Sequence, residues 1–144
     1  MKLNTAAKNY DELFGTFRWN APPRYNMARE SLRGAGRRGR SRFALYYEDE
    51  AGHTEAWTFW DIRCRPTALS NVLHALGVMR RDRVAIILPQ RPETGIAHIA
   101  CYQMDAIALP LSHLFGPDAL EYQLENSEAS VAIVDQPRCP SCGR

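Results

Sequence analysis

Few residues in this sequence have the types and spacing of a catalytic or binding motif. The first candidate motif is a pattern of three glycines. Gly34, Gly36 and Gly39 form G-x-G-x-x-G, which binds dinucleotide phosphates when a strand precedes it and a helix follows it. Here a short helical stretch precedes the glycines, and the strand-like segment FALYYED follows them. The order of elements is wrong for a phosphate loop, so we expect no dinucleotide site at these glycines.

A pair of cysteines near the C-terminus has the spacing of half a zinc site. Structural zinc takes four ligands in a tetrahedron, and Cys139 and Cys142 supply two. His113 is the nearest histidine, and adding it still leaves the ligand set incomplete. We therefore expect no metal site within one chain and two free thiols, while a zinc site shared between two chains stays open. Cys64 and Cys101 fall in predicted helices and resemble small apolar residues.

The third group lies at the ends of two predicted strands. Arg91 follows the apolar run VAIILP, and Ser112 and His113 follow the run AIALPL. Ligands of open α/β sheets bind at the carboxyl ends of the strands, so these three residues are our candidates for cofactor binding. Arg91 also precedes a predicted helix, where a guanidinium could meet an anionic group; the alternatives are a surface arginine and an ordinary loop. No Ser/His/Asp arrangement and no paired carboxylates emerge, and we assign no catalytic residue.

Three short apolar segments must position these candidates. Val84–Pro89, Ala106–Leu111 and Val131–Asp135 contain β-branched residues and alternate with segments of helical spacing. Pro92 and Pro117 stand where the two intervening helices begin, since proline is favoured at the first helical position. The order βαβαβ predicts an α/β fold whose parallel strands are joined by right-handed crossovers. The first run is continuously apolar, which predicts burial on both faces.

A β-hairpin precedes this unit. The segments Phe43–Asp49 and Glu55–Phe59 are rich in aromatic residues and lie on either side of Gly52. Strands of this composition, joined by a short glycine-containing turn, favour antiparallel pairing.

A helix follows the hairpin directly. Thr58 and Asp61 have the spacing of a capping box, and Gly77 follows the last apolar position of the helix. Pro66 falls inside this segment, so the helix either bends at the proline or begins there.

Composition divides the chain into three parts. Residues 1–42 are an aromatic and basic segment that ends in a Gly/Arg linker; we expect residues 1–26 to be irregular and Asn26 to cap a short helix. Residues 43–135 form an incomplete α/β subdomain. Residues 136–144 are polar, and we expect a disordered tail.

Charge is distributed unevenly along the chain. Residues 1–42 carry ten Lys/Arg against three Asp/Glu, whereas the net charge of the whole chain is only +2. A basic segment could suggest nucleic acid or acidic lipid. Few aromatic residues lie among the arginines between Ser31 and Arg42, so a stacking platform for bases is missing. We interpret the segment as a solvated linker and expect no nucleic-acid partner; an RNA- or zinc-binding adaptor is the alternative.

Length and composition are those of one globular domain. The chain has 144 residues, of which 45% are hydrophobic and 24% charged. No uncharged apolar run reaches the roughly 18 residues of a membrane span, and the first residues lack the apolar centre of a signal peptide. We therefore expect no membrane span and a cytoplasmic location.

The order and the amino-acid sequences of these segments resemble the N-terminal region of the adenylate-forming (AMP-binding) acyl-CoA synthetases, a family of acid–thiol ligases. The stretches that carry the resemblance cover most of residues 14–135: FRWNAPPRYNMA, FALYYEDEAGHTEAWTFWDI, LSNVLHALGVMRRDRVAIILPQRPE and IAHIACYQMDAIALPLSHLFGPDALEYQLENSEASVAIVD. No single stretch is a catalytic signature; their co-linear order carries the match. The resemblance implies an enzyme that activates a small-molecule carboxylic acid with ATP to an acyl-adenylate. It then passes the acyl group to coenzyme A, with Mg²⁺ on the phosphates.

The family's catalytic segments have no counterpart in residues 1–144. The phosphate loop ending in Pro-Lys-Gly, the adenine pocket, the ribose-binding Asp and the mobile C-terminal domain are all missing. We therefore expect a truncated N-terminal fragment that is inactive alone and binds no ATP, Mg²⁺ or CoA tightly. The alternative is a non-catalytic module that binds a nucleotide or CoA, or that complements a separately encoded C-terminal portion of the ligase.

This sequence departs from the family's pattern at three places. Pro66 interrupts a helix that is normally continuous, Asp105 stands where glycine is usual, and the chain ends where the family continues. Three parallel strands with only a few helices would also leave apolar sheet edges open, so we expect low solubility or loose packing.

Overall fold

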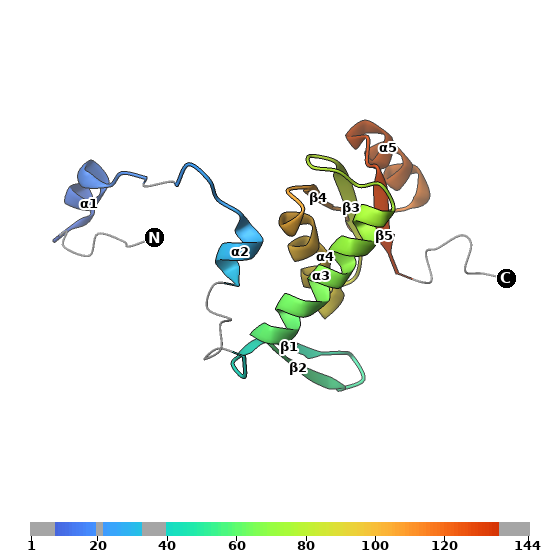
Figure 1. Ribbon diagram of the computed structural model, residues 1–144, viewed down its shortest axis with the longest axis horizontal. Helices are drawn as coiled ribbons and strands as arrows, with labels where there is room; N and C mark the ends of the chain where they lie inside the picture. The colour runs from blue at the N-terminus through green and yellow to red at the C-terminus, as the bar shows by residue number, and fades with distance from the viewer. Residues whose placement is uncertain (1–7, 20–21, 33–39, 136–144) are drawn as a thin grey trace.

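The computed structural model of the chain describes residues 8–19, 22–32 and 40–135 (Figure 1). The three glycines at 34, 36 and 39, the cysteines at 139 and 142, and the predicted tail over 136–144 lie outside these residues. The predictions made for them are therefore not tested by the structure.

The first helix, α1, spans Tyr10–Thr16. Our prediction of an irregular segment was wrong here, because the sequence contains a capping signal that we did not use. The side chain of Asn9 accepts a hydrogen bond from the backbone N–H of Glu12 at 2.9 Å. No residue of α1 is buried, and Figure 1 shows the helix away from the rest of the described chain.

The second helix, α2, spans Met27–Ser31 and begins where the sequence predicted. Asn26 Oδ1 accepts a hydrogen bond from the backbone N–H of Arg29 at 3.0 Å and so caps the helix. Ala28 is buried, which ties α2 to the body of the molecule.

The predicted β-hairpin is confirmed. Strand β1 spans Phe43–Glu48 and pairs in antiparallel fashion with β2, which spans Thr54–Thr58. Gly52 takes the left-handed conformation in the turn, with φ +80°. The Asp49 carboxylate accepts hydrogen bonds from the backbone N–H groups of two turn residues, which fixes the turn.

Helix α3 spans Phe59–Ala75, and it begins at the predicted capping box. Thr58 Oγ1 accepts a hydrogen bond from the backbone N–H of Asp61, while Asp61 Oδ2 accepts one from the backbone N–H of Thr58. The helix continues through Pro66, so the alternative start at this proline was wrong. Pro66 is buried, and the hydroxyl of Ser70 donates to its carbonyl at 2.9 Å.

The turn after α3 closes the helix with two hydrogen bonds of the Schellman type. The N–H of Gly77 donates to the carbonyl of His74, and the N–H of Val78 donates to that of Leu73, both at 3.0 Å. Gly77 has φ +90°, as its predicted position at the helix end requires. Asp105 takes the same left-handed conformation at the end of a later helix, with φ +55°.

The predicted parallel sheet is confirmed. It contains β3 (Arg83–Ile87), β4 (Ile107–Pro110) and β5 (Val131–Val134) in the order β4-β3-β5. Both neighbours of the central strand run parallel to it, and Ile86 stands opposite Pro110 on one side and Ile133 on the other. The protein is therefore α/β, with a hairpin before a three-stranded parallel sheet.

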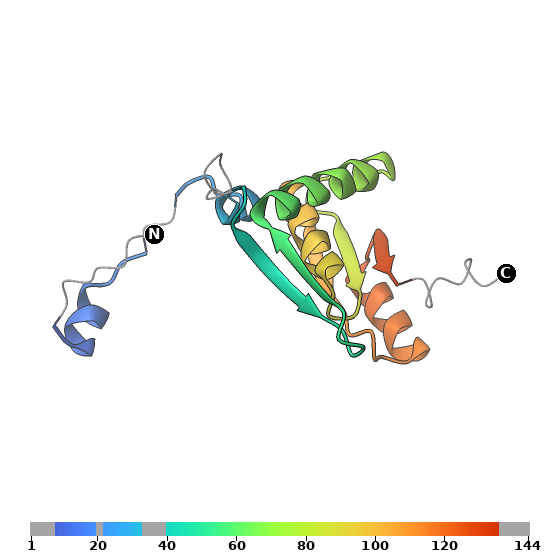
Figure 2. The ribbon, with the colours of Figure 1, turned by 90° about the horizontal axis from the view of Figure 1, so that it is seen from below.

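Two crossover helices connect the strands and lie on opposite faces of the sheet. α4 (Pro92–Gln103) joins β3 to β4, and α5 (Pro117–Ser127) returns past β3 to β5. Right-handed crossovers that run in opposite directions leave a sheet on different sides, so the two helices are expected on opposite faces. Figure 2 shows α5 on the far side of β3 from α4, and α3 packs beside α4.

The core lies between β3 and the pair α3 and α4. Four residues of β3 are at most 3% exposed, as expected for a central parallel strand: Val84, Ala85, Ile86 and Ile87. Both faces of β3 are therefore covered, although α5 buries none of its own residues. None of the described helices combines the length and the apolar character that crossing a membrane requires.

Candidate functional site

The carboxyl ends of the three parallel strands define the candidate site. The chain moves from β3 to β4 in one direction and then back past β3 to β5, so the strand order reverses beside β3. In open α/β sheets, ligands bind outside the carboxyl ends of the strands at such a reversal. A pocket of about 390 Å³ lies at this place, between the ends of β3 and β5. Its lining consists of Leu69, Leu88, Arg91, Glu93, Ile96, Ile133, Val134 and Asp135.

Arg91 is the predicted site residue that the structure places in this pocket. It stands just before Pro92, the first residue of α4, and its side chain does not cap the helix. The loop from β3 is held by Thr94, whose hydroxyl donates to the carbonyl of Pro89 at 2.7 Å. Both Arg91 and the N-terminus of α4 therefore face the edge at which ligands bind in folds of this kind.

Two carboxylates balance the charge of Arg91. Its Nε lies 3.5 Å from Glu93 Oε2, and its Nη1 lies 3.7 Å from Asp135 Oδ1. The three side chains are 34–53% exposed, so water reaches the cluster and weakens the ion pairs. An anionic ligand would have to compete with these carboxylates, whereas a hydroxyl or amide ligand could hydrogen-bond to them.

The structure does not bring Ser112 and His113 into this pocket. Both follow β4, on the opposite side of β3 from β5, and both are half-buried. Ser112 Oγ accepts a hydrogen bond from the backbone N–H of Leu114 at 3.2 Å, so the hydroxyl shapes its own loop. These two residues share the carboxyl edge with Arg91 and line none of its pocket.

Asp135 and Glu93 are pocket residues that sequence reasoning missed. Glu93 lies two residues after Arg91, and Asp135 ends the third predicted strand. The parallel order of the strands was a usable signal, because it places the residue after β5 at the same edge as the residue after β3.

Metal ligands do not gather in the part of the chain that the structure describes. No group of three or more His, Cys, Asp or Glu residues there could hold an ion. Cys64 is exposed, unlike the packed apolar residue that we predicted, while Cys101 is buried as predicted. Burial raises the pKa of the Cys101 thiol to about 11, so it is protonated at neutral pH.

Comparison with known proteins identifies the family. The profile of the family described as "AMP-binding enzyme" matches residues 32–142, which is most of the chain. The chain belongs to the AMP-binding enzyme family.

Relatives in this family include acetyl-coenzyme A synthetases. That of Bacillus subtilis is 34% identical over 137 residues, covering 88% of this chain and 24% of the relative. That of Streptomyces coelicolor is 36% identical over 92 residues, covering 64% of this chain and 14% of the relative. The chain thus spans about a quarter or less of the length of these AMP-binding enzymes.

A solved structure of the family agrees with the fold. The acyl-CoA synthetase of Brucella canis superposes with a TM-score of 0.79 at 26% identity, over 89% of this chain and 25% of that chain. The hairpin and the parallel sheet described above therefore correspond to one part of a larger AMP-binding enzyme. The resemblance inferred from the co-linear sequence segments is confirmed at the level of family and fold.

Proposed function

We propose that this chain forms one wall of the active-site region of an ATP-dependent acyl-CoA synthetase and does not catalyse the reaction alone. In the complete enzyme, a carboxylic acid would be activated with ATP and Mg²⁺ to an acyl-adenylate, and the acyl group would then pass to coenzyme A in the cytoplasm. The observation that supports this most is the family match over residues 32–142, on a sheet whose carboxyl edge carries a pocket.

The residues at the carboxyl edge of the sheet do not by themselves suit ATP or Mg²⁺. Arg91, the candidate for an anion, is already paired with Glu93 and Asp135, and the described chain offers no cluster of acidic ligands for a cation. Both groups would therefore need residues from the portion of the relatives that this chain does not span. Within that enzyme, the role we assign to Arg91, Ser112 and His113 is to line the carboxyl edge of the sheet.

An assay of the isolated chain tests the expected lack of activity. The purified chain is mixed with ATP, Mg²⁺, coenzyme A and a panel of carboxylic acids, and AMP and pyrophosphate are measured. We expect no release above a control without protein. Clear turnover by the isolated chain would contradict the proposal.

The second candidate function is complementation of a separately encoded C-terminal portion, and the two outer strands favour it. The N–H of Ser130 donates to the carbonyl of Arg83 at 2.8 Å. From this residue onward, every second backbone N–H group along β5 points toward β3. The N–H groups of Val131 and Ile133 consequently point away from the sheet, and no described strand pairs with them. The β5 edge can therefore accept another strand.

The β4 edge is less able to accept a strand. Ile107 and Leu111 donate their N–H groups toward β3, so Ala108 and Pro110 face outward. Pro110 has no N–H, and a proline at an edge opposes strand addition. We therefore expect a complementing portion to pair with β5.

A co-purification experiment tests complementation. The chain is co-expressed with Bacillus subtilis acetyl-coenzyme A synthetase from which the segment matched by this chain has been removed. We expect the two polypeptides to co-elute, Ile133→Pro to abolish co-elution, and Ala108→Pro, the matched change on β4, to preserve it. Equal loss with both variants, or no co-elution of the unmodified chain, would exclude this candidate.

A further inference from the structure

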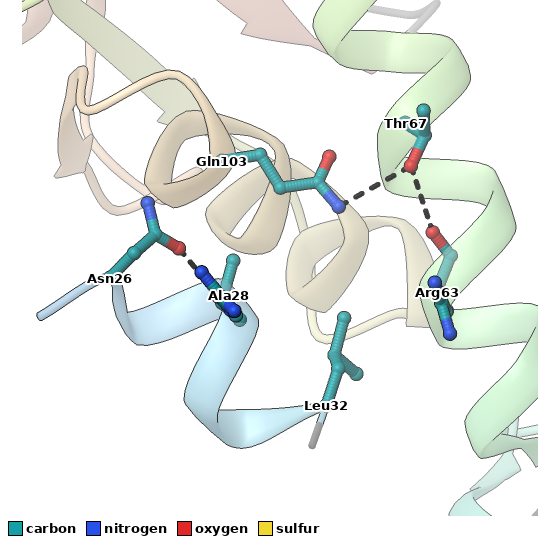
Figure 3. Close-up of a pocket in the computed structure, with 7 residues that line it drawn as sticks. Asn26, Ala28, Leu32, Arg63, Thr67 and Gln103 are labelled. Carbon is teal, nitrogen blue, oxygen red and sulfur yellow. Dashed lines mark hydrogen bonds between the residues drawn. The ribbon is translucent and has the colours of Figure 1, made fainter. Parts of the chain in front are cut away.

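A second pocket, which shares no lining residue with the Arg91 pocket, lies where α2 meets α3 and α4. It is a groove of about 680 Å³, within the size range of small-molecule sites. Figure 3 shows its walls: Leu32 and the start of α2 on one side, Arg63 and Thr67 of α3 opposite, and Gln103 of α4 between them. The proposed function above uses no residue of this groove.

The groove is positively charged and contains no carboxylate. Arg29 of α2 and Arg63 of α3 both line it, and none of its lining residues in the described part of the chain is acidic. Neither guanidinium forms an ion pair with any carboxylate of the described residues, in contrast to Arg80, Arg83 and Arg91. Two exposed and unpaired guanidinium groups beside one groove favour an anionic occupant.

A third arginine extends this charge. The guanidinium carbon of Arg40 lies 4.0 Å from the centre of the Trp60 ring, and that of Arg63 lies 5.9 Å from the same centre. Stacking on a ring orients a guanidinium and leaves the N–H groups at its edge able to donate. The stretch from Ser31 to Arg42, in which few aromatic residues lie among the arginines, contains no ring that could play this part. The structure supplies Trp60 from α3 instead.

The side-chain amide of Gln103 is held in place by two neighbouring side chains. The buried hydroxyl of Ser70 lies 2.9 Å from Gln103 Oε1, and Gln103 Nε2 donates to Thr67 Oγ1 at 3.4 Å. An amide nitrogen has two N–H groups, so one stays available for a ligand. Polar groups oriented before binding lose less entropy when a ligand arrives.

Asn26 fixes the α2 wall relative to α4. Its Oδ1 caps α2, while its Nδ2 donates to the carbonyl of Tyr102 at 2.7 Å and lies 3.2 Å from Asp105 Oδ1. Buried Ala28 packs on the same side of α2. Arg29 is therefore carried by a helix that is anchored to the body, and it lines the same groove as Arg63 of α3.

We propose that this groove binds a small molecule carrying two or more phosphate groups, with Arg29 and Arg63 as the principal ligands. A guanidinium donates two parallel hydrogen bonds to a phosphate, and two guanidinium groups on opposite walls suit an anion whose charge spans more than one phosphate. Arg40 adds to the attraction from beside Trp60. The site is separate from the Arg91 pocket, so phosphate binding in the groove does not depend on the proposed ligase function.

Titration calorimetry with inorganic pyrophosphate at low ionic strength tests the proposal. We expect saturable one-to-one binding by the 144-residue chain, weaker binding of inorganic phosphate, and weakening of both by salt. Arg29→Gln and Arg63→Gln should each reduce pyrophosphate affinity at least about tenfold, because each loses a charge-assisted hydrogen-bonding group. Adenosine triphosphate in a parallel titration shows whether a nucleoside adds to the affinity.

Two controls separate this site from general attraction to a basic protein. The variant Arg83→Gln removes a charge that pairs with Glu128 after α5, where neither residue lines the groove, and it should change affinity less than about twofold. Arg63→Lys keeps the charge and loses the paired donors, so its affinity should fall between those of the unmodified chain and Arg63→Gln. Circular dichroism verifies the helix content of each variant. Absence of pyrophosphate binding, or equal losses in the groove and control variants, would overturn the proposal.

Discussion

Arg91 Nη1 lies 3.7 Å from Asp135 Oδ1, so the side chain that follows β3 pairs with the side chain that follows β5. The pair joins the carboxyl ends of two neighbouring parallel strands beside the pocket. Because both side chains are partly exposed, the pair contributes little to stability. Its position is more informative, because ligands of open α/β sheets bind at this edge.

The first prediction separates stability from function at Arg91. Arg91→Gln should change the free energy of unfolding by less than about 1 kcal/mol, since exposed ion pairs contribute little. In a full-length chimera that carries this chain, the same change should lower acyl-CoA formation about tenfold if Arg91 contacts a ligand through a charge-assisted hydrogen bond. Arg83→Gln is the matched control, because Arg83 pairs with Glu128 at 2.9 Å at the other end of β3. Equal activity losses in both variants would remove Arg91 from the site.

The second prediction concerns the capping box of α3. Hydrogen bonds from the side chain and the backbone N–H of Thr58 lower the pKa of Asp61 below its ordinary value of 3.8. A carboxyl whose pKa is lower in the folded state adds stability above the pKa of the unfolded state, and this stability is lost as the pH falls through the folded-state pKa. Urea unfolding should therefore show stability decreasing below about pH 4, and Asp61→Asn should reduce that decrease.

A matched variant checks the cap itself. Thr58→Ala should lower the free energy of unfolding by about 1 kcal/mol at neutral pH, because it removes the oxygen that accepts from the Asp61 N–H. Thr58→Ser keeps that oxygen and should retain most of the stability. If Thr58→Ala leaves stability unchanged, the cap does not stabilise α3.

The third prediction concerns the reactivity of the thiols. Burial raises the pKa of Cys101 to about 11, so its thiolate is scarce at pH 8, whereas Cys64 is exposed. In a Cys139→Ser/Cys142→Ser background, a thiol reagent should modify Cys64 quickly and Cys101 only on unfolding. Fast modification of two thiols in the native protein would show that the core between α4 and β3 opens readily.

The raised pKa of Cys101 also sets a pH dependence with the opposite sign to that of Asp61. A thiol with a higher pKa in the folded state contributes stability that is present below the unfolded pKa of about 9 and is lost as the pH rises toward 11. Cys101→Ala should flatten the stability profile over this alkaline range.

The fourth prediction concerns the left-handed residue Asp105. Its carboxylate lies 3.6 Å from Arg80 Nε and 3.2 Å from Asn26 Nδ2, so it joins three segments near the amino edge of the sheet. Asp105→Ala should lower the free energy of unfolding by about 1 kcal/mol, because alanine tolerates φ +55° poorly and lacks both contacts. Asp105→Asn should cost less, since asparagine accepts this backbone conformation and can bond to Asn26. Urea denaturation of the two variants provides the comparison.

Local signals in the sequence were sufficient for most of the fold. Asn26, Thr58 and Gly77 mark helix ends through hydrogen bonds to neighbours three to five residues away, so their roles can be inferred from spacing. The continuous apolar run at Val84–Ile87 likewise predicts the central strand. The first helix was missed although Asn9 caps it, because exposed aromatic residues and nearby prolines suggested an irregular chain.

The two pockets could not be predicted in full from local sequence signals, because their residues come together from distant parts of the chain. Pairing of Arg91 with Asp135 requires β5 to lie beside β3, which follows from strand order and not from either segment alone. The stacking of Arg40 on Trp60 joins two segments of different predicted type. Asp135 and Trp60 meet their partners only through tertiary structure, and this is why sequence reasoning missed them.

The most direct measurement of the central claim uses a chimera. Residues 8–135 replace the matched segment of Bacillus subtilis acetyl-coenzyme A synthetase, and AMP release that depends on acetate and coenzyme A is measured beside that of the isolated chain. The account predicts activity in the chimera and none in the isolated chain. A folded but inactive chimera, or turnover by the isolated chain, would contradict the claim that this chain supplies one wall of a larger acyl-CoA synthetase.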